Sequence, residues 1–129
     1  AVGISPWLDL TQSGGSMESK AALDPMVQRE HLDRFAAAYL GGADAQSPTA
    51  SPLFADLAGL PSLLLHVGTA ETLLDDTLRF AERARAAKVD VSVDVYDDMV
   101  HVWHAFEVIL PEARDAIGRI GDFFRRRLA

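Results

Sequence analysis

The 129-residue chain contains no cysteine. This absence excludes a disulfide framework, a zinc site with thiolate ligands and a cysteine nucleophile. Long apolar runs are missing too, since none approaches the ~20 residues that a helix needs to cross a bilayer. The sequence also shows no signal-peptide pattern, so we expect a cytoplasmic protein without a membrane span.

Basic residues are scarce. The chain has 12 Lys and Arg residues against 19 Asp and Glu residues, which gives a formal net charge of −7 at pH 7. Nucleic acids and anionic membranes attract basic surfaces, so neither is an expected partner. Apolar residues make up 49% of the chain, enough for the core of one domain.

Two further features are absent from the sequence: an initiator methionine and a motif for a nucleophilic serine. The sequence has no initiator methionine and begins inside an apolar run, so we interpret it as a fragment or a processed product. It also lacks the Gly-x-Ser-x-Gly motif that carries a nucleophilic serine. The nearest approach, Gly3-Ile4-Ser5-Pro6-Trp7, lacks the second glycine and has proline where a helix should begin. No nucleophile can therefore be assigned.

Three segments have the composition of buried β-strands: Ala1 to Ser5, Leu63 to Val67 and Val91 to Tyr96. The amphipathic pattern of Leu74 to Lys88 predicts a helix between the last two strands. A strand, a helix and a strand in about 35 residues form one βαβ unit with parallel strands. We therefore predict an α/β protein of three layers, the C-terminal part of a doubly wound sheet. Its open edge at Ala1 to Ser5 would pair with another copy or with a missing N-terminal part.

The segment between the first two strands should contain one helix. Asp24 is a suitable N-cap and Pro25 a suitable first helical residue, while Gly41-Gly42 would end the helix. We expect residues 11–18, rich in Ser and Gly, to form a mobile loop. Three prolines should keep residues 43–61 extended: Pro48, Pro52 and Pro61.

A last helix is predicted to begin at Pro111. Four apolar residues at helical spacing should face the sheet: Ile117, Ile120, Phe124 and Leu128. The arginines of the same segment should face water.

Glu71 and His101 each follow a predicted strand by a few residues. Carboxyl ends of parallel strands meet at one edge, where α/β-hydrolases place the acid and the histidine of a catalytic triad. We expect a carboxylate oxygen of Glu71 within ~3.5 Å of a ring nitrogen of His101. The alternative for Glu71 is a solvated loop carboxylate. Triad geometry alone also leaves Asp75 as a candidate acid, although Asp75 and Asp76 are expected to cap the helix that follows them.

The other histidines have simpler interpretations. His104 lies within an apolar stretch and should sit at a helix start or at the edge of the core, while His66 should be a core residue and His31 a surface residue. A metal site is a further alternative, because oxygen and nitrogen ligands gather in one short stretch: Asp97, Asp98, His101 and His104.

Several stretches, taken in order, resemble the hormone-sensitive-lipase-like family of α/β-hydrolases, the bacterial carboxylesterases. The matching stretches are Ile4-Ser5-Pro6-Trp7-Leu8-Asp9-Leu10-Thr11, residues 51–61, Val67-Gly68-Thr69-Ala70-Glu71-Thr72-Leu73-Leu74-Asp75-Asp76, Asp98-Met99-Val100-His101-Val102-Trp103 and the helix from Pro111 to Leu128. Together they span nearly the whole chain.

The resemblance implies that Glu71 is the acid and His101 the histidine of a Ser-His-Glu triad, in a carboxylic ester hydrolase acting on short-chain acyl esters. It implies a small-molecule ester as substrate and no cofactor. The family's oxyanion loop and nucleophile elbow lie upstream of the matching stretches, so residues 1–129 would be the C-terminal portion of one catalytic domain. The alternatives are a non-catalytic docking or oligomerising module and a small metal-binding domain.

Overall fold

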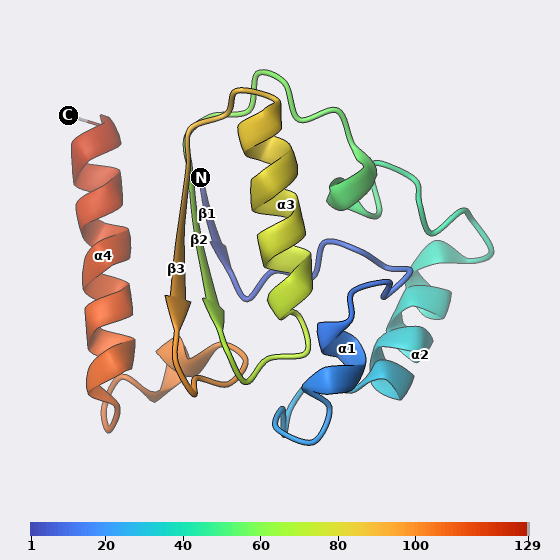
Figure 1. Cartoon of the computed structure of the whole chain (residues 1–129), viewed down its shortest axis with the longest axis horizontal. Helices are drawn as coiled ribbons and strands as arrows, with labels where there is room; N and C mark the ends of the chain where they lie inside the picture. Colours follow the sequence, from blue (N-terminus) through green and yellow to red (C-terminus); the bar gives the residue numbers. More distant parts are fainter. Residues whose placement is uncertain (129) are drawn as a thin grey trace.

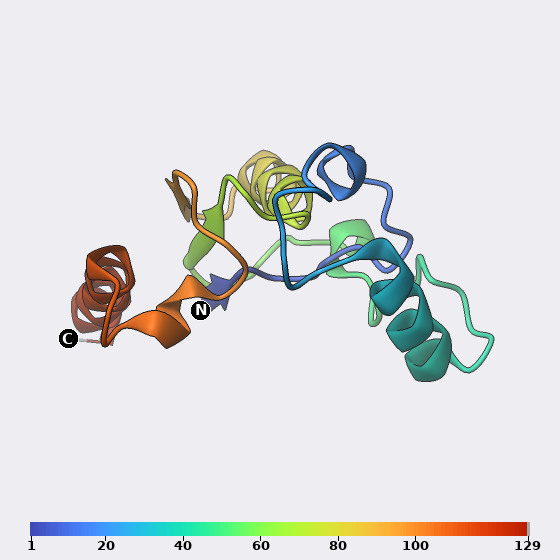
Figure 2. The same cartoon turned by 90° about the horizontal axis from the view of Figure 1, so that it is seen from below.

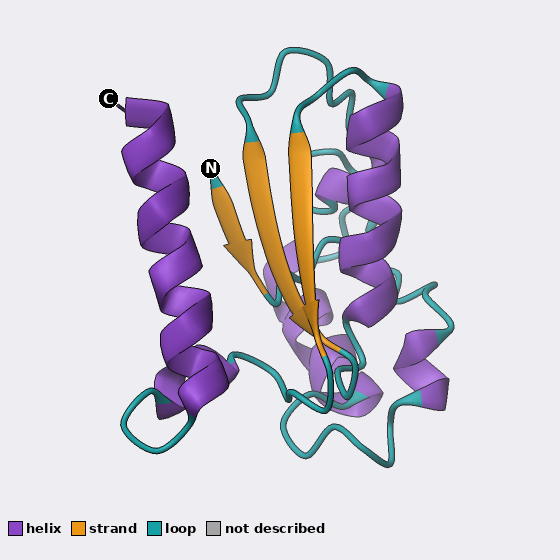
Figure 3. Ribbon diagram, turned by 60° about the vertical axis from the view of Figure 1, so that its left-hand side comes forward, coloured by secondary structure: helices purple, strands orange, loops and turns teal. Residues whose placement is uncertain are grey.

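A three-stranded parallel sheet forms the centre of the molecule, whose computed structural model describes residues 1–128 (Figure 3). The strands are β1 (Val2–Ile4), β2 (Leu63–Gly68) and β3 (Val91–Tyr96), in the order β1-β2-β3. All pairings are parallel, so the three carboxyl ends meet at one edge of the sheet. The predicted α/β class and parallel sheet are confirmed.

Helices cover both faces of this sheet (Figure 1). One face carries α3 (Leu74–Ala86), and the opposite face carries α4 (Pro111–Leu128). Figure 2 shows that the part of the chain between β1 and β2 extends away from α4, beyond β1 and α3. That part contains α1 (Ser16–Ser19), α2 (Arg29–Leu40) and the 3-10 turn η1 (Pro52–Phe54), whereas a second 3-10 turn, η2 (Trp103–Phe106), lies beside α4.

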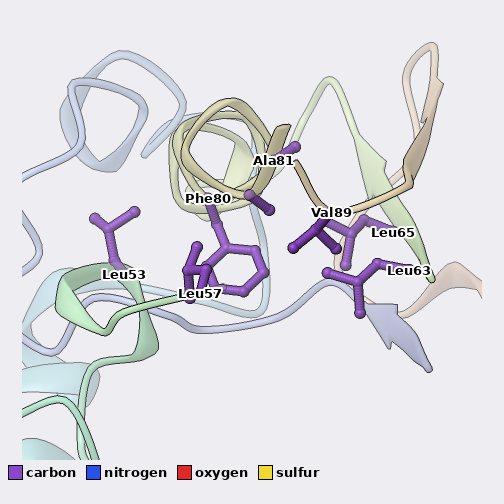
Figure 4. Close-up of a cluster of buried hydrophobic side chains, with 8 residues drawn as sticks. Leu53, Leu57, Leu63, Leu65, Phe80, Ala81 and Val89 are labelled. Atoms are coloured by element: carbon purple, nitrogen blue, oxygen red, sulfur yellow. The ribbon is translucent and has the colours of Figure 1, made fainter. Parts of the chain in front are cut away.

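The main hydrophobic core lies between β2 and α3 (Figure 4). Its buried members are Leu53, Leu57, Leu63, Leu65, Phe80, Ala81, Ala84 and Val89. Every residue of β2 is buried, because β1 and β3 cover its edges and helices cover its faces. This explains why the sequence of β2 is mostly apolar and does not alternate between apolar and polar residues. Burying each large apolar side chain contributes about 1.5–3 kcal/mol.

The helix predicted to start at Pro25 begins four residues later, at Arg29. Asp24 does not cap it. Oδ1 of Asp24 accepts hydrogen bonds from the N–H groups of Met26 and Val27, at 2.9 Å each, and Oδ2 accepts one from the N–H of Thr72 at 3.0 Å. Asp24 therefore makes a local turn and a long-range link, and the prediction of an N-cap is wrong. The predicted end is confirmed, since Gly41 adopts a left-handed backbone with φ of 55°.

The Ser- and Gly-rich segment is not a plain loop, because it contains the short helix α1. The buried hydroxyl of Ser16 donates to the carbonyl of Thr72 at 2.6 Å and accepts from the N–H of Asp75 at 3.0 Å. These contacts join the segment to the start of α3. The proline-rich stretch also departs from the prediction, because Pro52 opens the 3-10 turn η1.

The face of α4 that packs inward differs from the predicted one. Its buried residues are Ala113, Ala116 and Phe123, and the indole of Trp103 is fully buried against the two alanines. The small side chains of Ala113 and Ala116 therefore leave room for the indole of Trp103 on the inward face of α4. Three of the four residues predicted to face inward are exposed: Ile117 (44%), Phe124 (41%) and Leu128 (81%). Among residues 1–128, no helix has both the length and the apolar character needed to cross a membrane.

Candidate active site

Glu71 and His101 meet at the carboxyl edge of the sheet. Glu71 lies in the loop after β2 and is fully buried, whereas His101 lies in the loop after β3 with 23% of its side chain exposed. Nδ1 of His101 lies 3.2 Å from Oε2 of Glu71, within the predicted distance. The alternative of a solvated Glu71 is therefore wrong.

This contact bears on the tautomer of the imidazole. When Glu71 is ionised it can only accept hydrogen bonds, so Nδ1 of His101 is then the donor. In the neutral ring the proton then resides on Nδ1 and leaves Nε2 as the basic nitrogen. A histidine in this tautomer, oriented by a hydrogen bond to a carboxylate, can act as a general base through Nε2.

One N–H group and one O–H group bind the other oxygen of Glu71. Oε1 accepts hydrogen bonds from the N–H of Gly68 at 2.6 Å and from the hydroxyl of Ser5 at 2.8 Å. Since Oε1 already has two donors, Oε2 is the oxygen left for His101. The carboxylate is thus fixed in place by the ends of β1 and β2.

The loops of Glu71 and His101 are packed directly on one another. The N–H of Ala70 donates to the carbonyl of Met99 at 3.2 Å, and the N–H of Asp98 donates to the hydroxyl of Thr69 at 2.8 Å. A Cβ on Gly68 would lie only 1.9 Å from the Met99 carbonyl oxygen. Glycine is therefore required for this approach of the two backbones.

His101 also lines a cavity of about 520 Å³. The rest of its wall comes from α2 and the residues before it: Met26, Val27, Gln28, His31, Leu32 and Phe35. Most of these side chains are apolar, which suits a small apolar ligand beside the imidazole.

Asp75 and Asp76 are not alternative acids, and neither caps α3. Oδ2 of Asp75 accepts from the N–H of Ser16, while Oδ2 of Asp76 accepts from the N–H groups of Leu8 and Asp9, each at 2.9 Å. These residues thus bind a distant segment rather than their own helix, which corrects the prediction. Burial raises the pKa of Asp76 to about 6, although its two backbone donors oppose this.

His104 belongs to the core and not to the site. Its Nε2 lies 3.0 Å from Nδ1 of the buried His66, and the two rings are stacked. Burial, together with the neighbouring His66, lowers the pKa of His104 to about 4. His31 is exposed on α2, as predicted. Within residues 1–128, no three His, Cys, Asp or Glu side chains lie close enough to hold a metal ion, so the proposed ligands do not converge.

Ser5 is also part of this site, which was not predicted from the sequence. In the sequence Ser5 stands in an imperfect nucleophile motif, whereas in the structure its hydroxyl is buried and bonded to Glu71. The signal that could have found Ser5 is topological. It follows β1 just as Glu71 follows β2, so the two residues share one edge of the sheet.

Residues 1–105 match the protein family described as the alpha/beta hydrolase fold. The chain belongs to this family. An acetyl-hydrolase of Streptomyces hygroscopicus is 42% identical over 125 residues, which cover 97% of this chain and 42% of that protein. An esterase of Acinetobacter venetianus is 39% identical over 122 residues, covering 93% of this chain and 40% of that protein.

Solved structures give the same result. The crystal structure of an esterase from the bacterial hormone-sensitive lipase family is 51% identical, with a TM-score of 0.97, and the match covers 99% of this chain and 43% of that one. The resemblance to hormone-sensitive-lipase-like esterases is confirmed. The chain spans about two fifths of the length of the relatives that it matches.

Proposed function

We propose that this chain supplies the acid and the histidine of a Ser-His-Glu carboxylic ester hydrolase, with Glu71 as acid and His101 as base. The observation that carries the proposal is the 3.2 Å contact from His101 Nδ1 to a fully buried Glu71. The names of the relatives, an acetyl-hydrolase and an esterase, support the same chemistry. Residues 1–129 would then be the C-terminal portion of one catalytic domain, and the rest of that domain would provide the serine.

In this mechanism Nε2 of His101 takes the proton of the serine hydroxyl as the serine attacks the ester carbonyl. The imidazolium that forms is stabilised by Glu71, which stays ionised. His101 then gives the proton to the leaving alcohol. Water then attacks the acyl-enzyme and loses a proton to His101. As the carboxylic acid is released, His101 returns this proton to the serine oxygen, which restores the free serine.

The substrate would be a short-chain acyl ester. The cavity beside His101, at about 520 Å³, is lined mainly by apolar side chains that would contact a small acyl or alkoxy group. A related esterase with 48% identity was crystallised and soaked with p-nitrophenyl butyrate, which makes this ester a suitable probe.

The rest of the catalytic domain would pair with β1. This strand forms one edge of the sheet, and its outer side has no strand neighbour among residues 1–128. An open edge is a template for a further strand. A second copy of the chain using the same edge is the alternative occupant, in a docking or oligomerising module.

A chimera can test the triad. In this "reconstituted enzyme" the chain replaces the matching 43% of the hormone-sensitive-lipase-family esterase. A fluorophosphonate probe, which reacts only with activated serines, should label the reconstituted enzyme but not the 129-residue chain alone. Glu71→Gln should slow labelling strongly, whereas the matched control Glu82→Gln, on the exposed side of α3, should not. Equal labelling of the wild type and Glu71→Gln would contradict the proposal.

A further inference from the structure

Ser5 occupies an unusual position at the end of β1. It is 3% exposed, and its N–H donates to the carbonyl of His66 at 2.8 Å, which extends the pairing of β1 with β2. Its backbone is left-handed, with φ of 46°. This conformation is strained for a residue other than glycine and persists only where surrounding contacts enforce it.

The hydroxyl of Ser5 joins the two loops of the candidate active site. It lies 2.8 Å from Oε1 of Glu71 and 3.1 Å from the N–H of Val102. The carboxylate can only accept, so the single hydroxyl proton is directed to Glu71. The N–H of Val102 can only donate, so it binds a lone pair of the same oxygen. Both partners are thus satisfied in one orientation of the hydroxyl.

The second of these hydrogen bonds acts on the backbone beside His101. Val102 follows His101 directly and has a left-handed backbone, with φ of 51° and ψ of 42°. That region is a genuine outlier for a β-branched residue, so an external contact must hold it. The hydroxyl of Ser5 is such a contact, and it comes from the residue after β1, whereas Glu71 and His101 follow β2 and β3.

We propose that Ser5 is a positioning residue for the Glu71–His101 pair. Its hydroxyl donates to Oε1 of Glu71, so that Oε2 faces the imidazole. The same hydroxyl accepts from the N–H of Val102, which fixes the backbone next to His101 and directs the imidazole toward Glu71. The inference rests on the proposed function for its catalytic meaning, but the positioning itself can be measured without any reaction. Ser5 is not assigned a contact with substrate.

Three variants of the 129-residue chain separate positioning from general stability. Ser5→Gly removes the hydroxyl and relieves the left-handed strain, whereas Ser5→Cys keeps a weaker donor and acceptor at the same place. The matched control is Ser51→Ala. Like Ser5, Ser51 is buried, and its hydroxyl accepts a hydrogen bond from the N–H of Leu10 at 2.8 Å and donates one to the carbonyl of Ala45 at 2.6 Å, away from the site.

The readout is the pair of ¹⁵N shifts of the His101 ring, measured at alkaline pH, where the imidazole is neutral. The wild type should show one tautomer, with the proton on Nδ1. Ser5→Gly should move both shifts toward the average of a free imidazole, Ser5→Cys should lie between, and Ser51→Ala should lose stability without moving them. Wild-type ring shifts in a folded Ser5→Gly chain would overturn the inference. If Ser5→Gly does not fold, wild-type shifts in Ser5→Cys would do so.

Kinetics in the reconstituted enzyme complete the test. Loss of one hydrogen bond that orients the pair should lower kcat about 10-fold in Ser5→Gly with KM little changed. A rise in KM alone would place Ser5 in substrate binding and overturn the positioning role. A failure of the proposed function is distinguishable, because His101→Ala would then retain activity while the ring shifts still responded to Ser5.

Discussion

Gly68, the last residue of β2, is in direct contact with Met99 in the loop of His101: a Cβ on Gly68 would lie 1.9 Å from the Met99 carbonyl oxygen. A backbone oxygen cannot move aside as a flexible side chain can. The position of His101 relative to Glu71 therefore depends on the absence of a side chain at residue 68.

Gly68→Ala should lower the free energy of unfolding by about 2–3 kcal/mol, because the loops of Glu71 and His101 must separate. Urea unfolding followed by circular dichroism measures the change. The matched control is Gly118→Ala in α4, where an added Cβ meets no atom within 4 Å. Removing a helical glycine there should stabilise the chain by about 0.5–1 kcal/mol. Similar effects of the two substitutions would show that the contact at Gly68 is unimportant.

Asp76 should make the chain less stable at neutral than at acidic pH. Its pKa is raised from 3.8 to about 6 on folding, mainly by burial, so the folded state favours the protonated acid. The stabilisation is complete below the unfolded pKa and is lost as the pH rises through the folded one, so its window runs from about pH 4 to about pH 7. Over that window the free energy of unfolding of the wild type should fall by up to about 3 kcal/mol relative to that of Asp76→Asn. Urea unfolding at several pH values measures this difference, and parallel pH profiles of the free energy of unfolding for the two chains would refute the prediction.

His104 should act in the opposite direction. Burial and the adjacent His66 lower its pKa from 6.5 to about 4, so the folded state favours the neutral ring. This contribution is present above the unfolded pKa and is lost as the pH falls toward the folded one, between about pH 6.5 and pH 4. Over that interval the free energy of unfolding of the wild type should fall by up to about 3 kcal/mol relative to that of His104→Gln. Thermal melts across the interval measure the difference, and a constant gap would be inconsistent with a buried neutral His104.

The chain alone should not hydrolyse p-nitrophenyl butyrate faster than free imidazole does. It contains the Glu71–His101 pair but no Gly-x-Ser-x-Gly motif, and each missing oxyanion donor typically lowers the rate by about 10²–10³. Initial rates with freshly purified chain, and with His101→Ala as the blank, provide the measurement. Turnover of about 1 per second or faster would mean that a serine of this chain serves as nucleophile.

The pairing of Glu71 with His101 could be predicted from sequence because it depends on topology: both residues follow strands of one βαβ unit. The functions of Asp24, Asp75 and Asp76 could not, because local capping rules were overridden by partners far along the chain, such as Thr72 and Ser16. A carboxylate near the start of a helix has the same local sequence in either case. Only the folded arrangement shows which donors are near.

The inward face of α4 was mispredicted for a related reason. Helical periodicity identified Ile117 and Phe124 as an apolar stripe, but it carries no information on the space available. The buried indole of Trp103 fills that space, so Ala113 and Ala116 pack against it instead.

The central claim is that His101 is the base and Glu71 its acid, and turnover of p-nitrophenyl butyrate by the reconstituted enzyme tests it most directly. His101→Ala should lower kcat by at least about 10³-fold, and Glu71→Gln by about 10³–10⁴-fold through the wrong tautomer. His104→Gln should keep most of the activity below its melting temperature, because His104 bonds to His66 rather than to Glu71. Equal losses from His101→Ala and His104→Gln, or full activity in His101→Ala, would contradict the account.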